Sequence, residues 1–244
     1  MFEVYNDATP NGLKVSIALE ELALQYSIHR IFLGGEQLTP EFTKLNPNQK
    51  IPVLVDSDEG IVLTESGAIL VYLAEKTGKL LPKDTKGRTK TIELVFNQMS
   101  SLGPMLGQLL VFRGPWQNKF PEVSNRYFKE ATRIFGVLNT RLEGKPYFAG
   151  DAFTIADIAF FPWVAATTKF PMTADIQLSD YPNLNAWVGR IASRPAVQKG
   201  LTIPEPFPPE KQFEGFIRAT VGLGDLYKSP ARGGVPKGLA HLSP

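Results

Sequence analysis

The sequence predicts an α+β protein, with a small N-terminal domain of mixed strands and helices followed by an all-helical C-terminal domain. Residues 1–82 alternate short strand-like runs with helical ones in the order β-α-β-α-β-β-α, whereas residues 89–203 keep a helical period throughout. The polar stretch 83–88 breaks both patterns and is predicted to be the domain linker. A Pro- and Gly-rich C-terminal extension, residues 204–244, follows, and we expect it to lie over the helical domain.

The chain is predicted to begin with a strand–helix–strand unit. Apolar and polar residues alternate over Phe2–Tyr5, which is the period of a half-buried strand. After the turn ATPNG, a helix opens near Asn11 and shows an apolar face over Leu13–Leu24. A second strand, Ile28–Leu33, then follows. Two strands joined by a helix form the parallel crossover unit.

The rest of this domain is predicted to hold a short helix, a hairpin and a longer helix. Thr39 is followed by Pro at the start of the helix 40–45, a favourable cap and first residue. Two apolar runs, 53–55 and 61–63, flank the polar turn DSDEG and predict an antiparallel hairpin. The next helix starts at TES, residues 64–66, and runs to about Lys76 before a terminating glycine.

The second domain shows only helical patterns, which we predict at 92–112, 121–142, 155–167 and 182–193. Pro104 should interrupt the first of these helices. Thr154 and Asp157 have the spacing of a capping box, so they predict a helix start. The helix that follows, IADIAFFPWVAAT, is apolar almost all round and should lie in the middle of the bundle.

Composition excludes several kinds of function. The net charge is +2 without a long basic run, so we expect neither a nucleic-acid nor a membrane partner, and no apolar run approaches the roughly 20 residues that span a bilayer. The start MFEVYND lacks the basic region of a signal peptide, and we expect a cytoplasmic protein. The chain has no Cys and two His, which excludes a Cys nucleophile and a Cys/His zinc site, and we expect no metal. A Ser-His-Asp triad would have to use His29 or His241.

The first candidate site is the turn between the first strand and the first helix. Small polar side chains lie there beside the unpaired N–H groups of a helix N-terminus, which favours an anion. Because the chain has no cysteine, we expect the anion to be the thiolate of a bound thiol. Lowering a thiol pKa from about 8.5 to about 6.5 requires ~2.7 kcal/mol, which one or two charge-assisted hydrogen bonds supply. Thr9 and Asn11 could donate them; alternatively, they only form the turn and cap.

Two further elements could hold the rest of a small ligand. If the Ile51–Pro52 peptide bond were cis, the backbone N–H and C=O of Ile51 would face outward and could pair with an extended peptide; the alternative is an ordinary trans proline at a strand start. Glu65 and Ser66, at a helix start, could bind the ammonium and carboxylate of an amino-acid zwitterion. Their alternative role is a simple helix cap.

Together these elements resemble a glutathione transferase. The resemblance covers about Phe2 to Gly200 and rests on ATPNG, NPNQKIPVLVD, LTESGAILVYLAEKTG and FTIADIAFFPWV, which stand in the family's order. The stretches PNG, GEQLTPEF, GPMLGQ and NRY are similar to those of the bacterial Nu class and its fungal Ure-type relatives. The resemblance implies a thioredoxin-like N-terminal domain, an all-helical C-terminal domain, a homodimer, and glutathione as the bound cosubstrate.

The resemblance also implies roles for particular residues. The proline matching Pro52 is cis in the family, and the backbone of Ile51 pairs with the cysteinyl unit of glutathione. The residues matching Glu65 and Ser66 hold the γ-glutamyl end. Further contacts are implied for Gln37 and Lys50, near the glycine end, and for Arg126 of the NRY motif.

The residue that faces the sulfur stays open at this point. Tyr5 lies where the tyrosine classes of the family have their catalytic residue, but the following turn resembles the Nu-like class. In that class the residues matching Thr9 and Asn11 face the sulfur, and we favour these two over Tyr5.

The resemblance implies glutathione-dependent disulfide-bond oxidoreduction, with small or glutathionyl disulfides as substrates. Because the chain has no cysteine, both reacting sulfurs would come from glutathione and the partner disulfide. Aromatic side chains such as Phe112, Trp116 and Phe170 would line a second substrate site or belong to the core. The alternatives are conjugation or peroxide reduction with small electrophiles, and a non-catalytic ligand-binding or regulatory dimer.

Overall fold

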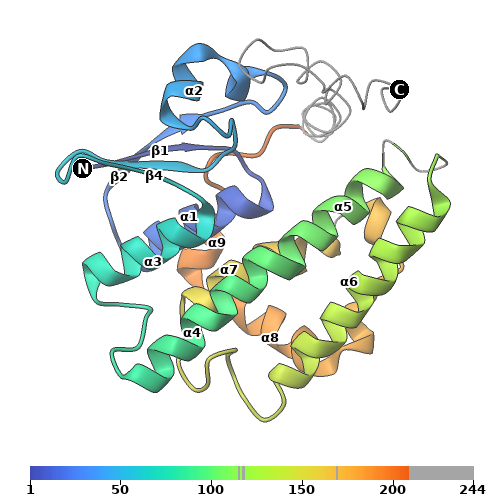
Figure 1. Cartoon of the computed structure of the whole chain (residues 1–244). Helices are drawn as coiled ribbons and strands as arrows, with labels where there is room; N and C mark the ends of the chain where they lie inside the picture. Colours follow the sequence, from blue (N-terminus) through green and yellow to red (C-terminus); the bar gives the residue numbers. More distant parts are fainter. Residues whose placement is uncertain (115, 117–118, 169, 209–244) are drawn as a thin grey trace.

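The structure is a computed structural model that describes residues 1–114, 116, 119–168 and 170–208 (Figure 1). The elements of the N-terminal part are β1 (Phe2–Asn6), α1 (Pro10–Glu21), β2 (Tyr26–Arg30), α2 (Pro40–Leu45), β3 (Val53–Asp56), β4 (Ile61–Thr64) and α3 (Ser66–Thr77). The elements that follow are α4 (Thr85–Asn97), a π-helical turn (Gln98–Leu102), α5 (Gly103–Arg113), α6 (Pro121–Arg141), α7 (Ile155–Thr167), α8 (Pro182–Ala192) and α9 (Pro195–Gly200). Short 3₁₀ turns lie at Glu36–Leu38, Pro171–Thr173 and Leu178–Asp180.

The N-terminal domain contains a four-stranded sheet in the order β2-β1-β3-β4. β1 and β2 run parallel, and both β1–β3 and β3–β4 are antiparallel. Helices α1 and α3 pack together on one side of the sheet, whereas α2 lies on the other side (Figure 1). This thioredoxin-like arrangement, followed by helices alone, confirms the predicted fold class.

Helix α7 occupies the centre of the second domain, as its apolar sequence predicts. Every residue from Ile155 to Val164 is buried, and α7 packs against α1, α4 and α8. Trp187 of α8 is fully buried against the same core. Within the described residues, no helix combines the length and apolar character that a membrane span requires.

The predicted capping box at the start of α7 is present, and its Asp157 also bonds to residues outside the helix start. The Thr154 hydroxyl accepts a hydrogen bond from the N–H of Ala156, and the Thr154 N–H donates to the Asp157 carboxylate over 2.9 Å. The same carboxylate accepts from the Phe148 N–H and the Trp187 indole N–H. Asp157 therefore joins three segments of the helical domain.

Several boundaries differ from the prediction because capping residues set them. Helix α1 begins at Pro10, ahead of the apolar stretch, since the Thr9 hydroxyl caps the N–H of Gly12 at 3.2 Å. Helix α4 begins at Thr85, inside the predicted linker, where Asp84 caps the N–H of Gly87. Strand β2 lies earlier than predicted, and α9 was not predicted at all. The division into domains stays a prediction.

The long helical run before residue 113 is interrupted close to Pro104, as the sequence predicts. A π-helical turn, Gln98–Leu102, separates α4 from α5, and Pro104 follows immediately in the first turn of α5. Proline lacks the N–H that a continuous helix needs, and π turns frequently occur at functional sites. Gln98, the first residue of this turn, is fully buried and points to the site described below.

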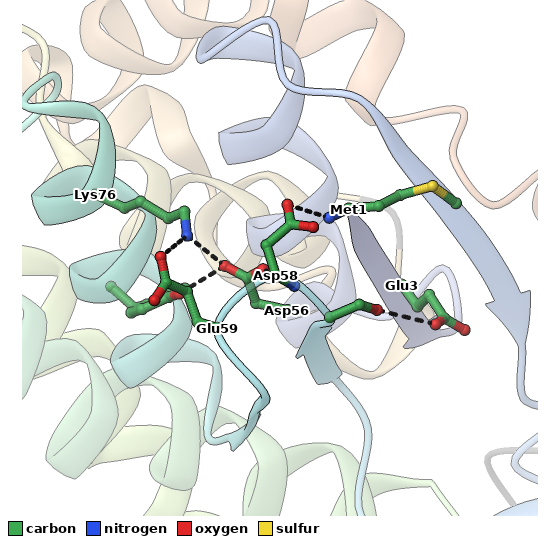
Figure 2. A network of polar contacts seen from close by, with 8 residues as sticks. Met1, Glu3, Asp56, Asp58, Glu59 and Lys76 are labelled. Atoms are coloured by element: carbon green, nitrogen blue, oxygen red, sulfur yellow. Dashed lines mark hydrogen bonds and ion pairs between the residues drawn. The ribbon is translucent and has the colours of Figure 1, made fainter.

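The β3–β4 hairpin is attached to α3 by a polar network (Figure 2). The Lys76 ammonium lies 2.7 Å from the Asp56 carboxylate and 2.9 Å from that of Glu59, and the Tyr72 hydroxyl donates to Asp56 over 2.6 Å. Burial acts to raise the pKa of Asp56, but the hydrogen bonds from Lys76, Tyr72 and the Asp58 N–H outweigh it and lower this pKa to about 2. The N-terminal ammonium pairs with Asp58 beside this network.

The first residues of the C-terminal extension lie against the N-terminal domain. The guanidinium of Arg30 lies 3.1 Å from the centroid of the Phe207 ring, which also meets Phe32 edge-on at 5.2 Å. The expectation that the extension lies over the helical domain is therefore wrong for Phe207, whose ring makes a cation–π contact with Arg30 of β2. The remainder of the predicted extension, 209–244, lies outside the described residues.

Candidate active site

Helix α1 begins just beyond strand β1, and its N-terminus could bind an anion. Thr9 is the N-cap, Pro10 has no N–H, and Leu13 donates back to the Thr9 carbonyl. The N–H of Asn11 has no partner among the described residues. The Thr9 hydroxyl thus serves as a cap, as the alternative proposed, and its own proton is still available to donate.

The side-chain amide of Asn11 is fixed in one orientation. Its Oδ1 accepts a hydrogen bond from Lys14 Nζ at 2.9 Å and another from Trp163 Nε1 at 2.8 Å. The indole N–H of Trp163 can only donate, so the atom of the amide that it contacts must be the oxygen. The Nδ2 group has no partner among the residues that the structure describes. Asn11 therefore offers its amide protons, together with its backbone N–H, to a ligand.

Lys14 is a buried lysine whose side-chain nitrogen joins two parts of the site. Its side chain is 1% exposed, and besides Asn11 it donates to Gln98 Oε1 at 2.6 Å and to Ser66 Oγ at 3.4 Å. Burial lowers the pKa of Lys14 well below its usual range, and the negative charge of Glu65 opposes this shift. Asn11 from α1 and Ser66 from α3 thus lie around the same nitrogen atom.

The Ile51–Pro52 peptide bond is cis, as the resemblance implies. The backbone N–H and C=O of Ile51 have no hydrogen-bond partner among the described residues. Tyr5 pairs with Val53 in the β1–β3 register, so the same register continued by two residues places Ile51 opposite Asp7, at the start of the turn that carries Thr9. An extended ligand backbone could pair with Ile51 beside the end of α1.

Glu65 and Ser66 stand at the N-terminus of α3. Glu65 is exposed, adopts a φ of +68°, and makes no side-chain capping hydrogen bond. A side chain with such a φ is uncommon, and strained residues cluster at ligand sites. Ser66 is 5% exposed and turned to Lys14. A simple helix cap, the alternative role, is therefore not what these side chains form.

The other predicted site residues, Gln37, Lys50 and Arg126, make no hydrogen bond to Asn11, Lys14 or Ser66 among the described residues. The Gln37 side chain bonds to its own loop, accepting from the Gly35 N–H and donating to the Leu33 carbonyl. Lys50 is exposed on the loop that leads to Ile51. Arg126 is exposed on α6, and no hydrogen bond or ion pair connects it to Asn11 or Glu65 among the described residues.

Tyr5 lies on the other face of the sheet from the α1 side. Val4 and Asn6 are buried, and the Asn6 amide donates to the Gly12 carbonyl of α1, whereas Tyr5 has the opposite orientation in the alternating strand. The Tyr5 ring stacks on His29 with centroids 4.5 Å apart. This arrangement favours Asn11 over Tyr5 as the group that faces a thiolate.

An aromatic cluster joins the adjoining ends of α5 and α6. Phe112 stacks on Tyr127 at 5.6 Å and meets Trp116 edge-on at 5.3 Å, and both Phe112 and Trp116 lie 6.0 Å from the ring of Phe120. Phe170 is a half-buried residue packed against the core. Of the three aromatic residues predicted for a second substrate site, Phe112 and Trp116 therefore lie in this cluster, and Phe170 packs against the core.

The sequence prediction missed Lys14, Gln98 and Trp163. One signal was available: Lys14 precedes Ile17 and Ala18 by three and four residues, so it lies on the buried face of α1, where a charge is unusual. Gln98 and Trp163 gave no such signal, because only the packing of the helical domain on α1 brings them to the site. No group of acidic or His side chains in the described part of the chain could hold a metal ion.

The fold is a thioredoxin-like domain with unpaired donors at the N-terminus of α1 and at Ile51, joined to a helical domain whose Gln98 and Trp163 contact the same site. Residues 8–76 match the profile of the glutathione S-transferase N-terminal domain, and residues 104–195 match that of the C-terminal domain. The disulfide-bond oxidoreductase YfcG of Escherichia coli K12 is 44% identical over 207 residues, covering 82% of this chain and 94% of that protein. The chain belongs to the glutathione S-transferase family, which confirms the resemblance.

Two solved structures are similar throughout the same region. A glutathione transferase from Burkholderia graminis, with two glutathione molecules bound per subunit, is 44% identical with a TM-score of 0.77, covering 84% of this chain and 88% of that one. A glutathione transferase from Pseudomonas putida, with one glutathione disulfide bound per subunit, is 38% identical with a TM-score of 0.80, covering 83% of this chain and 91% of that one.

Proposed function

We propose that this protein is a glutathione-dependent disulfide-bond oxidoreductase. The observation that carries the proposal is the Asn11 amide, whose Nδ2 protons are left unpaired at the N-terminus of α1 while its oxygen is held by two donors. Unpaired donors at a helix N-terminus stabilise a thiolate. The activity named for YfcG and the glutathione disulfide bound by the Pseudomonas putida protein support disulfides as the substrates.

The proposed reaction is thiol–disulfide exchange between two small molecules. The thiolate of bound glutathione attacks one sulfur of the disulfide, a new S–S bond forms, and the other sulfur leaves as a thiolate that takes up a proton. A second glutathione thiolate then attacks the glutathione sulfur of the mixed disulfide; glutathione disulfide forms, and the remaining substrate sulfur leaves as a thiolate that takes up a proton. Because the chain has no cysteine, the protein contributes thiolate stabilisation and orientation but no sulfur of its own.

The remaining residues would hold the rest of glutathione. The open N–H and C=O of Ile51, next to Pro52, would pair with the cysteinyl unit, and Glu65 with Ser66 would bind the γ-glutamyl ammonium and carboxylate. Lys50 and Gln37 would lie toward the glycine carboxylate. Arg126, exposed and near the aromatic cluster along α6, would attract carboxylates of a second glutathione or of the disulfide.

Activity assays separate this proposal from its alternatives. With glutathione and 2-hydroxyethyl disulfide we expect turnover that exceeds the rate of conjugation to a chlorinated aromatic compound. Dominant conjugation would favour the transferase alternative, and tight binding of an apolar dye without turnover of either substrate would favour the ligand-binding alternative. The paired substitution Thr9→Ala with Asn11→Ala should lower kcat/KM for the disulfide by about 100-fold, the cost of removing a preorganised donor. Full activity in this variant would contradict the assignment of the sulfur-facing residues.

We also propose that the protein is a homodimer. An apolar groove of about 650 Å³ lies between α3 and α4, and Phe96 at its edge is 68% exposed. Its lining residues are Leu63, Glu65, Gly67, Ala68, Val71, Tyr72, Glu75, Arg88, Ile92, Val95, Phe96 and Met99. A second copy would cover this apolar surface. Phe96→Glu should then yield monomers in sedimentation, and a monomeric parent protein would contradict the proposal.

The cytoplasm is the location we propose for this reaction. The glutathione pool there is poised to reduce disulfides, so both thiols that the exchange consumes are at hand.

A further inference from the structure

Lys14 is the buried titratable group of the site that the proposed reaction leaves without a role. Its nitrogen is surrounded by Asn11 Oδ1, Gln98 Oε1, Ser66 Oγ and, at 3.9 Å, Met99 Sδ. All of these are neutral, and no carboxylate lies within ion-pair distance of Lys14 among the described residues. Holding a lysine nitrogen in such a place is costly, because burial disfavours its charged form.

The contacts of Lys14 define its two possible effects on a ligand. First, Lys14 and Trp163 both hold the oxygen of Asn11, and this alone decides that the amide protons face away from them. Second, its nitrogen contacts residues of both helix N-termini, Asn11 on α1 and Ser66 on α3. An anion bound at either end would therefore lie close to this nitrogen and would favour its charged form. Glu65 is the carboxylate that acts on Lys14 electrostatically within the described chain, and it is exposed.

We propose that Lys14 is the positioning residue of the active site, which orients the Asn11 amide toward the glutathione sulfur and, in its protonated form, is the buried counter-charge of the thiolate once glutathione binds. This rests on the proposed function, because it assumes that the anion at α1 is a glutathione thiolate. Through Gln98 and Trp163 the helical domain takes part in the same task, since these side chains hold the other contacts of Lys14 and Asn11. Lys14 acts through Asn11 and through its charge, and it does not itself touch the reacting atoms.

The test compares the pKa of the glutathione thiol in complexes with full-length variants, measured by the ultraviolet absorbance of the thiolate across a pH series. Lys14→Met keeps the unbranched shape but removes the charge and the donors. Lys14→Gln keeps an N–H donor without the charge. Lys79→Met is the matched control, because Lys79 is exposed and lies after α3. Thermal unfolding of each variant checks that the fold is retained.

In Lys14→Met we expect the thiol pKa of bound glutathione to rise by about one unit or more, which lowers the thiolate fraction about tenfold below that pKa. Lys14→Gln should lie between Lys14→Met and the parent, and Lys79→Met should match the parent. In an Asn11→Ala background the effect of Lys14→Met should shrink, because its orienting part is already lost.

Two outcomes would overturn the proposal. One is a folded Lys14→Met protein, or Lys14→Gln if Lys14→Met does not fold, with the thiol pKa of the parent. The other is a rise in the thiol pKa that Lys14→Met causes to the same extent in the Asn11→Ala background and that Lys79→Met causes equally. If the parent protein itself neither lowers the thiol pKa nor reduces the disulfide, the proposed function fails first, and this result is separate from any effect of Lys14.

Discussion

At the scale of single residues, Asn11 is central to the proposed chemistry because its two amide atoms have different surroundings. The oxygen is occupied by Lys14 and Trp163, and the nitrogen is left for a ligand. Here the helical domain provides one of the two donors, so the orientation of Asn11 depends on both halves of the molecule.

Asn11→Asp separates the stability of the site from its activity. The carboxylate would still accept from Lys14 and Trp163 and would give Lys14 an opposite charge, so the free energy of unfolding should equal or exceed that of the parent. Its second oxygen would face the thiolate as an acceptor and repel it. We expect kcat/KM for disulfide reduction to fall by at least about 100-fold.

The control for this prediction is Asn11→Ala, which removes the donor without adding a charge and should lose less activity. Parent-like kinetics in Asn11→Asp, measured with the same disulfide, would show that the amide nitrogen does not face the sulfur.

Residues of the site that are close in sequence could be predicted, and those that meet only in space could not. The roles proposed for Asn11, Ile51 and Ser66 rest on turns, caps and motifs that a few neighbouring residues define. Trp163 bonds to a residue 152 positions away, and nothing local to it indicates this partner. Lys14 was detectable in principle, as a charge on a buried helix face.

At the scale of elements, the β3–β4 hairpin matters because it carries the strand that follows Ile51 and Pro52. Asp56 ends β3 and holds the hairpin to α3 through Lys76 and Tyr72 (Figure 2). Its pKa is lowered to about 2 against a usual value of 3.8, so the folded state binds fewer protons than the unfolded chain between these pH values. The stabilisation by Asp56 is full above about pH 5 and is lost as the pH falls toward 2.

Asp56→Asn should therefore destabilise the protein most at neutral pH. We expect the difference in unfolding free energy between parent and variant to shrink by about 2 kcal/mol between pH 5 and pH 2, as denaturant unfolding at each pH would show. Asp58→Asn, at a side chain that is 75% exposed, is the control and should show little such change. A difference that is constant over this pH range would contradict the role of Asp56.

Most elements could be predicted in kind but not in their limits. Hydrophobic periodicity identified the strands and the long helices, since it depends on which residues become buried. The first residues of α1 and α4 depend instead on caps by Thr9 and Asp84, which lie outside the apolar pattern. The short helix α9 is formed by six residues, too few for a period to be recognised.

At the scale of the whole molecule, α1 connects the two domains. It packs against α7 and lies beside α9 (Figure 1). Arg194, at the start of α9, makes a bidentate ion pair with Glu21 of α1 at 2.6 and 2.7 Å. Gly200 allows the closest approach, because a Cβ atom there would lie 2.7 Å from Ile17 Cα. The helix that carries Asn11 and Lys14 is thereby held from the helical side.

Two glycine substitutions test this packing. Gly200→Ala should lower the free energy of unfolding by about 1–3 kcal/mol, because the backbone of α1 must move to admit the methyl group. Gly189→Ala, on the exposed side of α8 with nothing within 4 Å of the added Cβ, should raise it by about 0.5–1 kcal/mol. Denaturant unfolding measures both. Equal effects of the two substitutions would contradict the close α1–α9 packing.

The most direct measurement of the central claim is a crystal structure of this protein with glutathione bound. We predict that the sulfur atom lies within hydrogen-bond distance of Asn11 Nδ2, that Asn11 Oδ1 keeps its contacts with Lys14 and Trp163, and that the cysteinyl backbone pairs with Ile51. A complex in which the Tyr5 hydroxyl is the group nearest the sulfur, with Asn11 turned away, would contradict the account.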